Sequence, residues 1–148
     1  MINCKMQFYV LRKDLCITAH NMHDVSKTRK GEIQTVSIDP CTSEPCTLKG
    51  GTTATITIVF VSNQDSNTAT LGGCASMKVF LSTVTLMNFP TTNICDQVNC
   101  PIVAGNTYTV KYSVEVPSKN ANNVEIKMTL SGDKGNTGCV KFIVNITK

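Results

Sequence analysis

The chain has 148 residues, the usual size of one domain, with 41% hydrophobic residues, eight cysteines and a formal net charge of +4. Its positive charge comes from residues 1–30, which hold six Lys or Arg and two Asp, whereas residues 31–148 hold eight of each sign. We expect no nucleic-acid binding, since that needs a basic stripe on the folded module. No apolar run approaches the roughly 20 residues of a membrane-spanning helix, so stable membrane insertion is not expected either.

Residues 1–30 are predicted to form an atypical, poorly ordered N-terminal segment before a domain of residues 31–148. The apolar stretch Phe8–Leu11 is shorter than the ~7–15 residues of a signal-peptide core. Arg12 and Lys13 follow it at once, so no leader peptide is visible. His20 and His23 are expected in a solvated loop rather than on a metal ion.

Alternating apolar residues from Glu32 onward predict strands with one buried face. The first of these strands hold Val36 and Ile38, then Ile56, Ile58 and Phe60.

The middle stretch, residues 71–90, is less regular. Its inward positions would be Met77, Val79 and Leu81, followed by Val84 and Leu86. A loop is expected through residues 87–90. Exposing Leu86, Met87 and Phe89 there would be costly unless they cover something apolar, so this loop is the candidate mouth of a cavity.

The later segments alternate most cleanly, at residues 108–116, 124–130 and 140–146, with Ile143 as the apolar exception. Stretches rich in turn-forming residues lie between strands, at 63–67, 118–123 and 131–136, the last as a hairpin connection. No segment fits a helix convincingly, so the pattern predicts an antiparallel sandwich or barrel.

Two cysteine pairs share one spacing, Cys41 with Cys46 and Cys95 with Cys100. Cysteines in short loops indicate disulfides and an oxidising, secreted or luminal compartment. Structural zinc sites usually place ligands closer together, so no metal is expected. Asn145 begins an Asn-Ile-Thr sequon on an outward strand position and is a candidate for N-glycosylation.

Several stretches resemble the ML lipid-recognition family, which includes the Niemann-Pick type C-two sterol-transfer protein and the group-two mite allergens. They are the run from Val36 through Cys46, Gly51 with the strand 55–60, and Asn99-Cys100-Pro101-Ile102 followed by Gly105. The resemblance spans about residues 31–148, and the composition is similar to that of arthropod members. It implies an all-β, immunoglobulin-like two-sheet antiparallel sandwich with an internal hydrophobic cavity between the sheets.

The same resemblance implies a set of disulfide bonds. These are Cys41–Cys46, Cys95–Cys100 and a bond from Cys139 to an upstream cysteine, for which Cys16 is the nearest candidate. Cys4 and Cys74 have no counterpart in the family. Cys74 is expected to be a buried, inert thiol, and a Cys4–Cys74 bond is left open.

The inward rows of the predicted strands read as ordinary core by themselves, and the resemblance implies that some of them line a ligand cavity. The candidates are Ile56, Ile58, Phe60, Met77, Val79, Leu86, Met87, Phe89, Tyr108, Val110, Tyr112, Val114, Val124, Ile126, Met128, Leu130, Val140, Phe142 and Val144. No serine elbow or carboxylate pair is present, so neither catalysis nor a cofactor is expected.

The expected function is a soluble, extracellular and monomeric carrier of a fatty acid, a long-chain alcohol or semiochemical, or a sterol. A chemosensory role and a receptor or membrane transfer partner fit this interpretation, and the extracellular space is favoured over the lysosomal lumen. Sterol is the weaker candidate, because the chain has no Trp and holds Ala121 and Leu130 at the positions aligned with the aromatic gate and tryptophan of the sterol-transfer branch. The alternatives are an innate-immune lipid-recognition module and a secreted interaction module with a fully packed core.

Overall fold

Strands make up most of the computed structural model, which describes residues 17–18, 33–41 and 46–148. The described elements are β1 (Ile17–Thr18), β2 (Ile33–Asp39), β3 (Cys46–Lys49), β4 (Thr53–Val61), β5 (Thr70–Val79), β6 (Ser82–Asn93), α2 (Cys95–Val98), β7 (Thr107–Glu115), β8 (Ala121–Gly132) and β9 (Gly135–Thr147). Within these ranges no helix is long and apolar enough to cross a membrane.

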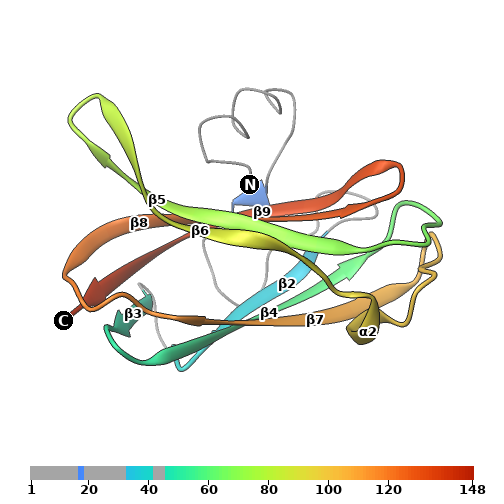
Figure 1. Ribbon diagram of the computed structural model, residues 1–148, viewed down its shortest axis with the longest axis horizontal. Helices are drawn as coiled ribbons and strands as arrows, with labels where there is room; N and C mark the ends of the chain where they lie inside the picture. The colour runs from blue at the N-terminus through green and yellow to red at the C-terminus, as the bar shows by residue number, and fades with distance from the viewer. Residues whose placement is uncertain (1–16, 19–32, 42–45) are drawn as a thin grey trace.

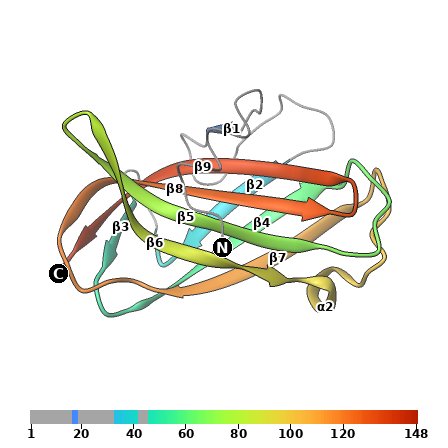
Figure 2. The same ribbon diagram turned by 45° about the horizontal axis from the view of Figure 1, so that its top comes forward.

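Two sheets face each other in a sandwich (Figures 1 and 2). The larger has the strand order β1-β9-β8-β5-β6, with β3 also pairing with β9, and the smaller has the order β2-β4-β7. The predicted all-β two-sheet sandwich is confirmed. It departs from a purely antiparallel arrangement because β1 and β3 both run parallel to β9.

The core lies between the sheets, where the predicted alternation places the apolar side chains. In the smaller sheet Ile58 lies opposite Val110, and in the larger sheet Ile126 lies opposite Phe142. These four side chains are buried. Ile143 is 40% exposed, in agreement with its outward position.

The irregular middle stretch forms the hairpin of β5 and β6. The loop predicted at residues 87–90 is therefore wrong, because β6 continues through them to Asn93. Register shifts between Leu71 and Gly73 and between Ala75 and Ser76 interrupt the alternation, which explains why the sequence pattern is unclear here.

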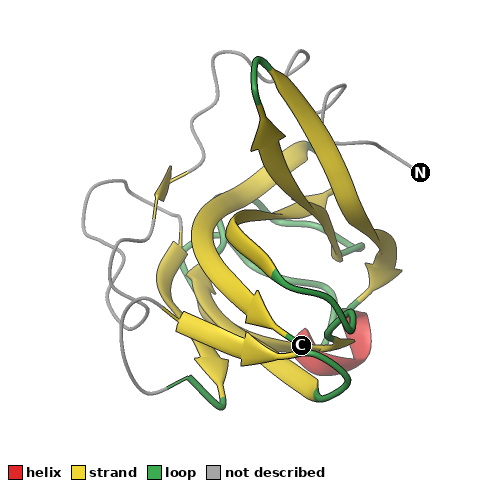
Figure 3. Ribbon diagram, turned by 90° about the vertical axis from the view of Figure 1, so that its left-hand side faces the viewer, coloured by secondary structure: helices red, strands yellow, loops and turns green. Residues whose placement is uncertain are grey.

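The turn of this hairpin projects away from the sandwich (Figure 3). Its side chains are exposed, at 42% for Val79, 97% for Phe80 and 104% for Leu81. The inward orientation predicted for Val79 and Leu81 is therefore wrong. This end of the β5–β6 hairpin extends past the end of the facing sheet, so that sheet does not cover Val79 or Leu81 (Figure 1).

Cys41 and Cys46 form a disulfide, as do Cys95 and Cys100. Cys74 is buried but is also disulfide-bonded, so the prediction of an inert thiol is wrong. Cys139 is disulfide-bonded as well. The pairings proposed for Cys4 and Cys16, and the placement of His20 and His23, lie outside the described residues.

Candidate functional site

A small cavity of about 30 Å³ lies between the sheets, at the end that carries the β5–β6 turn and the C terminus. Its lining residues are Leu48, Ala75, Leu86, Met87, Phe89, Val114, Glu115, Val116, Pro117, Val124, Ile126, Val144 and Ile146. A cavity needs roughly 10–15 Å³ to hold one water molecule, so this space has room for only a few.

The cavity adjoins a place where the two sheets are not joined by hydrogen bonds. β6 is an edge strand of the larger sheet and β7 is an edge strand of the smaller one. We call the gap between these two edges the β6–β7 seam. Leu86, Met87 and Phe89 reach the cavity from β6, and Val114 and Glu115 reach it from β7. The edges can therefore separate without breaking any ladder between them.

Seven of the residues that the sequence proposes for a ligand cavity lie around this space. They are Leu86, Met87, Phe89, Val114, Val124, Ile126 and Val144. Eight others are buried in the packed core away from it, namely Ile56, Ile58, Phe60, Val110, Met128, Leu130, Val140 and Phe142. Met77, Tyr108 and Tyr112 are partly buried against that core, and Val79 is exposed on the hairpin turn.

Six lining residues were not proposed from the sequence. They are Leu48, Ala75, Glu115, Val116, Pro117 and Ile146. Val116 and Ile146 continue the apolar alternation of residues 108–116 and 140–146, so the sequence pattern could have identified them. The pattern could not identify Ala75, because a register shift follows it. It could not identify Leu48 either, because its strand has only four residues.

The walls offer apolar contact and little else. Glu115 is the one ionisable side chain among the described lining residues, and it is exposed. In the part of the chain that the structure describes, no three His, Cys, Asp or Glu side chains gather as a metal site would require. The apolar walls suit the binding of an apolar group.

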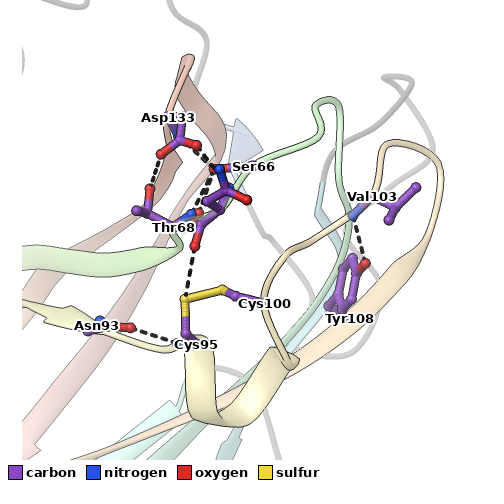
Figure 4. The surroundings of a disulfide bond; sticks show 9 residues. Ser66, Thr68, Asn93, Cys95, Cys100, Val103, Tyr108 and Asp133 are labelled. Atoms are coloured by element: carbon purple, nitrogen blue, oxygen red, sulfur yellow. Dashed lines mark hydrogen bonds between the residues drawn. A yellow bond between two sulfur atoms is a disulfide. The ribbon is translucent and has the colours of Figure 1, made fainter.

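At the far end of the seam, α2 and the Cys95–Cys100 disulfide connect β6 to β7 (Figure 4). The side-chain oxygen of Asn93 accepts a hydrogen bond of 2.8 Å from the backbone N–H of Cys95. This bond fixes the start of α2 relative to the end of β6.

Near this end, the exposed Asp133 carboxylate joins the β8–β9 turn to the segment before β5. It accepts hydrogen bonds from the Thr68 hydroxyl at 2.6 Å and from the Asn67 N–H at 2.8 Å. The Thr68 bond is the largest cause that lowers the pKa of Asp133, followed by the Asn67 bond.

The sequon residue Asn145 lies on β9 and is half-buried. Its side-chain oxygen accepts a hydrogen bond of 2.8 Å from the Asn123 N–H. Its role as a glycan acceptor stays a prediction.

Comparisons with known proteins agree with this architecture. Residues 15–146 match the ML domain family. Mite group 2 allergen Der f 2 of Dermatophagoides farinae is 33% identical over 119 residues, which cover 78% of this chain and 80% of the allergen. Mite group 2 allergen Eur m 2 of Euroglyphus maynei is 31% identical over 137 residues, covering 86% and 92%.

Among solved structures, the fold is similar to that of a Niemann-Pick type C2 protein from the Japanese carpenter ant. The TM-score is 0.63 at 21% identity, and the match covers 81% of this chain and 95% of that one. The predicted family resemblance is confirmed: the chain belongs to the ML domain family.

Proposed function

We propose that this protein is a non-enzymatic carrier that binds a long, flexible apolar molecule, such as a fatty acid or a long-chain alcohol, between its two sheets. The observation that carries the proposal is the apolar cavity at the unpaired β6–β7 seam. Membership of the ML domain family supports it.

The size of the cavity shapes the proposal. Small-molecule sites usually enclose about 300–1,000 Å³, whereas this one holds about 30 Å³. We call this arrangement of the β6–β7 seam, in which the cavity is too small for a whole ligand, the closed one; a ligand bound there requires the seam to widen. A flexible chain needs less widening than a rigid sterol, because it can follow a narrow space and Met87 in the wall can change rotamer.

The energy available from such a ligand is sufficient. Each buried methylene contributes about 0.8 kcal/mol, so a long alkyl chain offsets both the cost of association and some widening. No charged anchor is required inside the cavity.

The disulfides Cys41–Cys46 and Cys95–Cys100 support an oxidising compartment, and we place the carrier in the extracellular space. A monomer that meets a receptor or a membrane during transfer is consistent with this role.

A second candidate is a secreted interaction module with a packed interior. The small cavity favours it. The exposed Phe80 and Leu81 on the hairpin turn also favour it, as they offer apolar contact to a partner.

Displacement of a fluorescent fatty acid separates the two candidates. Long-chain acids or alcohols should displace the probe, and native mass spectrometry should show one lipid per chain. If no fatty acid, alcohol or sterol binds, the carrier function is refuted and the interaction module remains.

A further inference from the structure

The start of α2 is joined to the larger sheet, while the helix itself lies beside β7 of the smaller one. Ile94, directly before the helix, donates its N–H to the Ala69 carbonyl at 2.9 Å, and both Ile94 and Val98 are buried. Together with the Asn93–Cys95 bond, these contacts tie the start of α2 to the end of β6.

From this position the exposed side chain of Gln97 reaches across the seam to β7. Its amide nitrogen donates to the Lys111 carbonyl at 3.0 Å, and its amide oxygen accepts from the Lys111 N–H at 2.8 Å. Lys111 thus directs both backbone groups to the free edge of its sheet, where a neighbouring strand would normally bond them. The Gln97 amide takes the place of that strand.

The same point of the seam is also bridged on the inside. The rings of Phe89 on β6 and Tyr112 on β7 are in edge contact, with centroids 5.8 Å apart and planes at 60°. Phe89 lines the cavity, and the lining residues of β7 begin at Val114, three residues after Lys111. The two contacts therefore mark the closed end of the cavity.

These two bridges respond differently when the seam widens. A ligand that separates Phe89 from Tyr112 supplies apolar contacts in return. Gln97 is exposed and touches no part of the cavity, so an apolar ligand offers nothing in exchange for its two bonds. The Gln97 bonds therefore stabilise the closed conformation selectively.

We propose that Gln97 is a latch across the β6–β7 seam, a positioning residue that holds the empty carrier closed and thereby weakens its apparent affinity for ligand. The inference rests on the proposed carrier function. Its consequence is that removing a contact outside the cavity should tighten binding, since the affinity measured for a ligand is reduced by the fraction of protein that is closed.

The test uses two latch variants, Gln97→Met, which keeps the length and loses the amide, and Gln97→Asn, which keeps the amide and is too short to span. The control is Asn63→Ala, which removes a similarly exposed amide bonded to the Asn136 carbonyl at 3.3 Å away from the seam. Thermal unfolding identifies any variant that fails to fold. If only one of the two latch variants folds, that variant alone is enough for the test.

Two quantities are measured: the dissociation constant of a fluorescent long-chain fatty acid, and hydrogen exchange of the Lys111 amide. Both latch variants should bind the probe about fivefold more tightly, the net effect of two solvent-exposed hydrogen bonds. Lys111 should exchange faster in both, while Asn63→Ala matches the wild type in both measurements. A merely structural role for Gln97 would weaken binding instead.

Unchanged or weaker probe binding in the folded latch variants overturns the latch while leaving the carrier function standing. Unchanged exchange at Lys111, or equal tightening in Asn63→Ala, also overturns it. If the wild type binds no probe, the carrier function itself fails, and the latch fails with it.

Discussion

Replacing Ala75 by leucine should weaken ligand binding strongly while leaving the fold nearly as stable as before. Ala75 lies on β5 opposite Met87 on one side and Ile126 on the other, and all three line the cavity. The larger side chain would occupy the space of about 30 Å³ that a ligand must enter first.

The size of the effect follows from this geometry. The added carbon atoms contribute about 2 kcal/mol of burial at ~0.8 kcal/mol each, and repacking in a tight space costs about 1–3 kcal/mol. The free energy of unfolding should therefore change by no more than about 1 kcal/mol. A ligand that loses contact for a similar number of methylenes should bind roughly fiftyfold more weakly.

Two assays check this: displacement of a fluorescent fatty acid and urea unfolding. The matched control is Ala69→Leu, because Ala69 is equally buried but does not line the cavity. The control should lose about 1–3 kcal/mol of stability by overpacking and bind as the wild type does. Wild-type affinity in a folded Ala75→Leu variant would refute the assignment of this cavity as the ligand site.

The remaining predictions concern stability. Ile58→Ala should lower the free energy of unfolding by about 2–5 kcal/mol, because Ile58 is 1% exposed in the core. Phe80→Ser, on the 97% exposed hairpin turn, should stay within about 0.5 kcal/mol of the wild type. Denaturant unfolding compares the two variants, and equal losses would contradict the assignment of core and turn. Asp133 has a lowered pKa, so its bonds to Thr68 and Asn67 stabilise the fold above the ordinary value of 3.8 and lose this effect as the pH falls through the lowered pKa. Asp133→Asn should melt at a lower temperature than the wild type at neutral pH, with the difference vanishing in acid, and a difference that is constant with pH would contradict this account.

The sequence predicts those parts of the fold where alternation is continuous. In β7, β8 and β9 apolar residues recur at every second position of the sequence, and the structure turns them inward, half-buried in much of β7 and buried in 124–130 and 140–146. The structure also buries Lys127 and residues 137–139, which this pattern does not predict. β5 and β6 were harder to recognise, because β5 contains Gly72 and Gly73, carries two register shifts and ends in an exposed apolar turn. Each of these features breaks the pattern for a local reason.

The cavity itself was predictable only in part. Alternation identifies inward residues such as Ile58 and Val144, but it does not show which of them meet the opposite sheet and which face the seam. That difference depends on where the edge strands β6 and β7 of the two sheets lie in the folded sandwich. Gln97 has no sequence signal at all, because its role comes from the tertiary position of Lys111.

The strand order has a consequence for how the chain is synthesised. β9 is the last of the described strands, and it pairs with β8 on one edge and with both β1 and β3 on the other. On the ribosome, β3 therefore waits for a partner until residues up to Thr147 have emerged. β2, β4 and β7 are complete earlier, but their inner face has no finished layer to cover it. Synthesis from the end of β7 at Glu115 to the end of β9 at Thr147 takes several seconds at about 5–20 residues per second, and the inner face stays uncovered during that time. The sandwich therefore closes after β9 has been translated.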